Sequence, residues 1–192
     1  MDFAELNERL KQARLESYCR VRGGWPVPLA GGTYWAVLTL LGYTVSDEDW
    51  SWMAAMLSGS IFPIALLYGA LFRNPFMKEK MPDQGVVFMA MAGMLMFWPA
   101  AILAMGANND LVPLMLAIGM STHWPVFGWS YGRPVPFLVH MIARGVLVTV
   151  IWVALPEARF TLLPLSVALI YLATVIALYV DSGEFRSRIQ PA

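Results

Sequence analysis

The sequence predicts an all-α integral membrane protein with six transmembrane helices and proline kinks, preceded by a short N-terminal amphipathic helix. Mean hydropathy is +0.59, and charged residues make up only 14% of the chain, so a soluble domain of this size would have too little polar surface to cover its core. Six apolar runs are each long enough to cross a hydrocarbon layer of about 30 Å. The basic residues also gather in alternate loops, as they do in multi-pass membrane proteins.

Residues 1–24 are predicted to form the amphipathic helix. Phe3, Leu6 and Leu10 recur at helical spacing, and a Gly-Gly pair ends the pattern. Two interpretations of this helix stay open. It lies on the cytoplasmic surface of the membrane with its arginines near anionic headgroups, or it is a solvated helix that packs on the protein's own loops.

The six predicted spans follow in a transmembrane domain of residues 25–181, and the connections between them are too short to hold another domain. Residues 182–192 are predicted to be a cytoplasmic tail. Three prolines lie well inside spans, where each removes one backbone donor and kinks its helix. These prolines are Pro63, Pro99 and Pro125. The predicted spans are 26–44, 51–72, 85–105, 111–131, 135–155 and 160–180.

The basic residues predict the topology. If alternate loops share a side, eleven of the thirteen Lys and Arg residues fall on one side, and only Arg159 falls on the other. Because cytoplasmic loops are enriched in Lys and Arg, we expect both termini in the cytoplasm of a cell with a bacterial-type inner (plasma) membrane. The remaining basic residue, Arg144, falls inside the fifth run. The eleven are Arg9, Lys11, Arg14, Arg20, Arg22, Arg73, Lys78, Lys80, Arg133, Arg186 and Arg188.

The candidate site consists of polar side chains in the fourth and fifth spans. His140 and Arg144 are one turn apart on one face of the fifth predicted helix. His123 in the fourth span has a similar depth to His140, because the hairpin between the two spans turns near Gly132. We therefore expect a single polar pocket between these helices. The predicted pocket residues are Ser121, Thr122, His123, Tyr131, His140 and Arg144.

Arg144 has no carboxylate partner in the predicted spans, since all thirteen acidic residues fall in loops, termini or span edges. A buried arginine costs at least about 2.5 kcal/mol in a bilayer, so it needs a partner or a purpose. Two interpretations stay open. Arg144 and His140 either cap the Ser121 carbonyl and brace the kink at Pro125, or they bind a ligand.

Neither a metal nor a cofactor is expected. The chain has a single cysteine, which excludes a multi-cysteine zinc site, and it lacks H-E-x-x-H, P-loop and G-x-S-x-G motifs. Haem held by His123 and His140 is a lesser alternative, because adjacent helices of one tight hairpin leave limited room for a porphyrin.

The leading functional expectation is a transporter or channel for a small anionic or polar solute, in which Arg144 attracts the solute and the histidines hydrogen-bond it. A less favoured alternative is an intramembrane enzyme that acts on a lipid or lipid-linked substrate, with Arg144 holding phosphate and a histidine acting as general base. A third class is a non-catalytic membrane module that regulates or binds a partner protein. Expected partners are membrane lipids, the solute and, for so small a transporter, a second copy in a homodimer; nucleic acid is not expected.

Overall fold

The computed structural model describes residues 2–81 and 83–189, with side chains as far as residue 185. The described chain is all helical, with 82% of residues in helices and no strand. The helices and 3-10 turns are α1 (Phe3–Arg20), η1 (Arg22–Gly24), α2 (Pro26–Leu41), α3 (Asp47–Ser58), α4 (Ile61–Leu71), α5 (Gln84–Met94), η2 (Leu95–Phe97), α6 (Trp98–Ala107), η3 (Asn109–Leu111), α7 (Val112–Gly119), α8 (Trp124–Ser130), α9 (Pro134–Ala154), η4 (Pro156–Ala158) and α10 (Leu162–Ile189).

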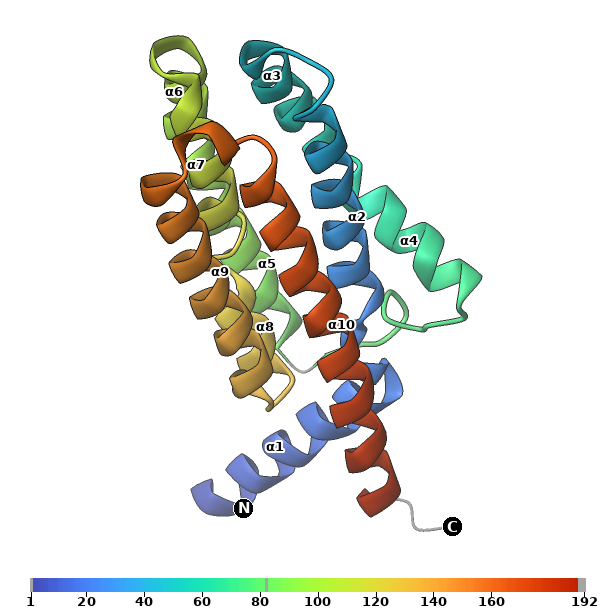
Figure 1. Cartoon of the computed structure of the whole chain (residues 1–192). Helices are drawn as coiled ribbons and strands as arrows, with labels where there is room; N and C mark the ends of the chain where they lie inside the picture. Colours follow the sequence, from blue (N-terminus) through green and yellow to red (C-terminus); the bar gives the residue numbers. More distant parts are fainter. Residues whose placement is uncertain (1, 82, 190–192) are drawn as a thin grey trace.

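Successive segments run in alternating directions through the bundle (Figure 1). From the end where α1 lies, α2 runs away, α3 and α4 return, and the α5–α6, α7–α8, α9 and α10 segments continue to alternate. Helix α10 packs against α2 on one side and α9 on another, and α8 packs against α9. Large side chains such as Trp35, Leu116 and Leu163 fill the core without any exposed surface. The path brings the end of α10 back to the end of the bundle that holds α1.

The helices are interrupted near each of the three prolines at which kinks were predicted. A bend of 50° separates α3 from α4, two residues before Pro63, and a 3-10 turn, η2, separates α5 from α6 before Pro99. The third break separates α7 from α8 before Pro125. Because proline lacks the N–H that would bond four residues back, the Ser121 carbonyl accepts instead from the Trp124 N–H at 3.1 Å.

Four described helical segments are long and apolar enough to cross a membrane: Gln84–Ala107, Asn109–Ser130, Pro134–Ala154 and Leu162–Phe185. The bent pair of α3 and α4 makes a fifth if it counts as one span. Helix α2, which covers most of the first predicted span, has only 16 residues, and one side of it, including Tyr34, Trp35 and Leu38, is buried. The structure thus supports the prediction of an all-helical protein with several membrane-crossing helices, and it leaves the count of six as a proposal.

The C-terminal half of α1 packs on the protein's own loops through polar contacts. Arg14 pairs with Asp83, and both side chains are nearly buried. Further along the helix, Arg20 pairs with Glu79 at 2.7 Å. The N-terminal half differs, because apolar Phe3 is 82% exposed there. Of the two open interpretations, packing on loops describes the C-terminal half of the helix.

The last helix is longer than the predicted span. It continues through residues 182–189 of the predicted tail, and residues 190–192 lie outside the described residues. Tyr18 of α1 donates to Asp181 at 2.7 Å, and Arg133 also bonds Asp181. These contacts tie α1, the α8–α9 turn and α10 together at one end of the bundle.

Candidate functional site

Arg144 lies in the middle of α9 with none of its surface exposed. Its Nη1 donates to the hydroxyl of Tyr171 in α10 at 2.9 Å. The guanidinium carbon also lies 5.2 Å from the ring centroids of both Tyr171 and Trp35, the latter in α2. A guanidinium at this distance is attracted to the negative face of an aromatic ring. Arg144 therefore points toward α10 and α2, with one hydroxyl and two aromatic rings as its partners.

Two glycines of α2 make room for Tyr171. A Cβ added to Gly31 would lie 2.7 Å from the Tyr171 ring, and one added to Gly32 would lie 3.1 Å from the Tyr171 Cβ. Such contacts are too close for any larger residue to leave the ring where it is. The Gly-Gly pair therefore lets α2 and α10 approach closely and positions the phenol beside Arg144.

His140, one turn before Arg144, is also buried, with 2% of its surface exposed. Its Nδ1 lies 2.7 Å from the hydroxyl of Thr174 in α10. Since that hydroxyl donates its own proton to the Ile170 carbonyl at 2.8 Å, it accepts from Nδ1–H. In neutral His140 the proton is thus on Nδ1, and Nε2 is an acceptor.

Trp124 forms the wall of this group on the α8 side. Its ring stacks on His140 with centroids 4.3 Å apart and an angle of 28° between the planes. The same ring lies 5.7 Å from Tyr171 and 5.7 Å from Phe137. We call Trp35, Trp124, His140, Arg144, Tyr171 and Thr174 the Arg144 cluster.

Several polar atoms of the Arg144 cluster are buried without a hydrogen-bond partner. They include two of the three guanidinium nitrogens of Arg144, Nε and Nη2. The indole N–H groups of Trp35 and Trp124 and the Nε2 of His140 are in the same condition. A buried polar group without a partner costs about 1–3 kcal/mol, and more if it is charged. This concentration of unsatisfied polar atoms, four donors and one acceptor, around one cation is the strongest sign of a binding site in the described chain.

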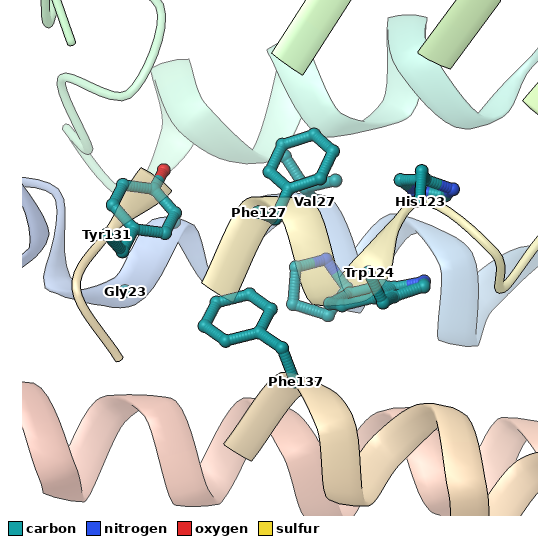
Figure 2. A pocket seen from close by; sticks show the side chains of 9 residues that line it. Gly23, Val27, His123, Trp124, Phe127, Tyr131 and Phe137 are labelled. Carbon is teal, nitrogen blue, oxygen red and sulfur yellow. The ribbon is translucent and has the colours of Figure 1, made fainter. Parts of the chain in front are cut away.

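A small cavity adjoins the cluster through Trp124. The space left for the centres of water-sized molecules is about 20 Å³, enough for a single water. Figure 2 shows His123 and Tyr131 at opposite ends of this cavity, with Trp124, Phe127 and Phe137 between them. The rest of the wall comes from Gly23 and Gly24 of η1 and from Val27 and Pro28 in the first turn of α2. Trp124 thus belongs both to the lining of the cavity and to the Arg144 cluster.

The structure brings together only part of the predicted pocket. His140 and Arg144 lie in the cluster, whereas His123 and Tyr131 line the neighbouring cavity. The hydroxyl of Ser121 donates to the Ile118 carbonyl at 2.6 Å. Similarly, Thr122 donates to the Gly119 carbonyl at 3.0 Å. These two hydroxyls satisfy the backbone at the break between α7 and α8 and do not face Arg144, and no hydrogen bond joins Arg144 to Ser121.

Four members of the cluster were not predicted: Trp35, Trp124, Tyr171 and Thr174. The sequence contains a signal for two of them, because Trp35 and Tyr171 lie near the middle of their apolar runs. Amphipathic aromatic residues of membrane proteins concentrate at the ends of spans. An indole or phenol at mid-span therefore indicates a polar partner inside the bundle.

Among the described residues, no group of three or more His, Cys, Asp or Glu side chains could hold a metal ion.

No curated protein and no solved structure matches the chain. A family of unknown function, DUF7010, matches residues 10–181. This range contains the whole Arg144 cluster, the cavity and most of α1. The chain therefore belongs to the DUF7010 family.

Proposed function

We propose that this protein is a transporter or channel that binds a small anionic or polar solute at the Arg144 cluster. The carrying observation is the fully buried guanidinium whose Nε and Nη2 have no partner. The indole N–H groups of Trp35 and Trp124 add further free donors to the cluster. A small anion supplies the acceptors that these donors lack, and it compensates the buried positive charge.

The partners of Arg144 favour binding over bracing. A brace would use the donors of the guanidinium within the protein, whereas Arg144 uses only Nη1, on Tyr171. The Ser121 carbonyl, which a brace would cap, is already satisfied by Trp124. The Nε2 acceptor of His140 further suits a solute that carries a hydroxyl or an amine beside its anionic group.

The route of the solute in this proposal passes Trp124. The Trp124 indole lines the cavity that Gly23 and Gly24 also line, and it stacks on His140. Rotation of the Trp124 side chain would open a way from this cavity toward His140. The break between α7 and α8 lies directly before Trp124, and a break in a helix is where a span can bend without losing many backbone bonds.

The same proposal includes six spans with both termini in the cytoplasm of a cell with a bacterial-type inner membrane. Helix α2 would be the first span, and its length of 16 residues gives a rise of about 24 Å. Because α2 packs against α10 and α4, lipid does not surround it on all sides, and a helix of this length can act as a span. The α1 end of the bundle holds Arg14, Arg20 and Arg133, in keeping with a cytoplasmic location.

The test is solute flux into proteoliposomes made with the purified full-length protein. Chloride, acetate, inorganic phosphate and, as a neutral polar solute, glycerol are the probes. We expect faster entry of at least one anion than in empty liposomes, and loss of that entry in Arg144→Met. Thr149→Val is the matched control, because Thr149 is on the exposed side of α9 and bonds only the Gly145 carbonyl.

Three results would contradict the proposal. If no probe enters the proteoliposomes faster than it enters empty liposomes, the protein does not transport this class of solute. Equal flux in Arg144→Met and the wild type would remove Arg144 from the path. A Soret absorbance band in the purified protein would instead support haem at His123 and His140.

A homodimer, expected for a transporter of this size, would appear as twice the chain mass in detergent.

A further inference from the structure

Two hollows adjoin on the outside of the bundle, where η1 meets the end of α4. The first, of about 330 Å³, is lined mainly by basic and aromatic side chains, including Arg20, Arg22, Trp25 and Phe72. The second, of about 440 Å³, follows α4 past Leu66. Both hollows share the turn that begins at Arg73. Together they form one site with a basic end and an apolar end.

The backbone is strained at two arginines of the basic end. Arg22 has a φ of 49° and Arg73 a φ of 53°, and they are the only described non-glycine residues with positive φ. Each of them directly follows the C-cap of a helix, Val21 for α1 and Phe72 for α4, where a left-handed residue commonly ends the helix. In a residue other than glycine this conformation costs about 1–2 kcal/mol. The Asn74 amide, which donates to the Val21 carbonyl at 2.8 Å, joins the two strained turns. The fold thus holds two arginines at one hollow at a cost.

Arg22 and Arg73 remain available for an anion, whereas Arg20 does not. Arg20 pairs with Glu79 at 2.7 Å and with Glu16 at 3.6 Å. The Arg22 Nη1 donates only to a neutral group, the Tyr179 hydroxyl at 2.9 Å. For the Arg73 guanidinium, the described residues include no hydrogen-bond or ion-pair partner. The basic end therefore has two uncompensated positive charges.

The apolar end would suit an acyl chain. Helix α4 is bent by 50° relative to α3. The groove along it is lined by Leu66, Ala70, Phe76 and Met77, and Lys78 also belongs to the lining. A Cβ on Gly69 would lie 2.6 Å from the Phe76 ring, so Gly69 lets Phe76 form the floor. At the border, Trp25 and Phe72 pack edge to face at 5.1 Å, as aromatic rings do at headgroup depth.

We propose that this site binds one anionic phospholipid, with its phosphate on Arg22 and Arg73 and an acyl chain in the groove along α4. Arginine suits a phosphate because its planar fork of donors matches two phosphate oxygens at once. This site is separate from the Arg144 cluster and does not depend on the transport proposal.

The test is native mass spectrometry of the full-length protein in detergent, titrated with phosphatidylglycerol or phosphatidylcholine. We expect phosphatidylglycerol to bind at least tenfold more tightly. Arg22→Gln and Arg73→Gln should each weaken it about tenfold, the effect of losing one charge-assisted hydrogen bond. Lys80→Gln is the matched control, because it removes the same charge from the same loop but lines neither hollow.

A second comparison distinguishes a lipid from free phosphate. Ala70→Phe, which fills the groove, should abolish preferential phosphatidylglycerol binding while the protein keeps its melting temperature. Inorganic phosphate up to 10 mM (roughly ten-thousandfold above a micromolar lipid affinity) should not displace the lipid. The proposal is overturned if Lys80→Gln weakens binding as much as Arg73→Gln, if the two lipids bind equally, or if free phosphate displaces the lipid and Ala70→Phe has no effect.

Discussion

The Arg144 cluster and the polar contacts beneath α1 use buried arginines in opposite ways. At the α1 end, which we call the clamp, Arg14 pairs with Asp83 and Arg133 pairs with Asp181. In the cluster, Arg144 is more deeply buried than either of these arginines, yet it has a phenol and two aromatic faces in place of a carboxylate. Both arrangements place positive charge away from water, but only the clamp neutralises it inside the protein.

The clamp has the chemistry of a fixed structural joint. Asp181 accepts from Tyr18 as well as from Arg133. Burial of the Tyr18 phenol raises its pKa, and the hydrogen bond to the Asp181 carboxylate raises it further. Glu79 accepts from both Ser17 and Arg20. Each carboxylate therefore has at least one charged partner. The comparison teaches that this protein pairs arginines with carboxylates where they hold elements together, including the buried Arg14, so an unpaired buried arginine in the same fold indicates a different role.

The largest expected effect is at the clamp. Arg14→Met would leave the Asp83 carboxylate nearly buried without a cation, which costs about 3 kcal/mol of stability. It would also remove the guanidinium that lies 3.8 Å from the centroid of the Trp129 ring. Thermal unfolding in detergent, followed by circular dichroism, measures the loss.

Arg9→Met in the same helix is the control for the loss of one α1 arginine. Arg9 pairs with Glu5 in an exposed i,i+4 bridge, and such pairs contribute only about 0.5 kcal/mol. Equal melting temperatures for the two variants would show that the Arg14 to Asp83 pair does not stabilise the joint.

The next largest effect is expected where α2 meets α10. Gly31→Ala places a methyl group 2.7 Å from the Tyr171 ring, and overpacking of this kind costs about 1–3 kcal/mol. Because the ring must move, the bond from Arg144 should weaken, and anion flux should fall with stability. Flux assays and thermal unfolding of the same preparation measure both effects.

Gly145→Ala is the matched control for this substitution, since a Cβ on Gly145 meets nothing within 4 Å. Alanine in the middle of a helix is favoured over glycine by about 1 kcal/mol, so this variant should be as stable as the wild type or more stable. A Gly31→Ala protein that melts and conducts like Gly145→Ala would mean that Tyr171 is not positioned by close packing.

Arg144→Met is expected to change stability little, in contrast to Arg14→Met. Replacing a buried charge that lacks a carboxylate partner by an apolar side chain of similar size is often neutral or stabilising, so we expect a change within about 1 kcal/mol. The melting temperature in detergent is the measurement. A decrease as large as that of Arg14→Met would make Arg144 a brace and would remove the physical basis of the transport proposal.

The smallest effect is expected from acidification. The hydrogen bond from Arg20 holds the pKa of Glu79 below its ordinary value of 4.5. A carboxyl with a lowered pKa in the folded state stabilises that state above its unfolded pKa, and this contribution is lost as pH falls through the folded pKa. Because Arg20 is half exposed, we expect a contribution of no more than about 1 kcal/mol.

Melting temperatures between pH 6 and pH 3 test this pH dependence. Glu79→Gln should be less stable than the wild type at pH 6, and the difference should shrink toward pH 3. Glu8→Gln, in an exposed pair with Lys11 at 3.8 Å, should follow the wild type throughout. A constant difference between Glu79→Gln and the wild type would show that the ionised carboxylate is not what stabilises this contact.

Local sequence features were sufficient to predict an all-helical chain with several helices apolar and long enough to cross a membrane, and to place the breaks in these helices. Apolar runs of this length exclude most other structures, and proline lacks a donor wherever it lies, so the breaks before Pro63, Pro99 and Pro125 could be placed without a structure. The isolation of Arg144 from carboxylates could also be predicted, because it depends only on which residues occur within the spans.

Only the tertiary structure decided what Arg144 meets. The sequence placed His140 and Arg144 on one face of a helix, but the partner of that face depends on how the bundle packs. Proximity along the chain favoured the preceding helix and its Ser121, whereas α9 directs Arg144 toward Tyr171 of α10 and Trp35 of α2. Trp35 in particular lies far from Arg144 in sequence. The close approach of Tyr171 depends on Gly31 and Gly32, and hydrophobic periodicity does not reveal that role of the two glycines. The sequence by itself thus determined that a lone cation lies within the bundle, and packing between distant helices determined the aromatic and hydroxyl groups that surround it.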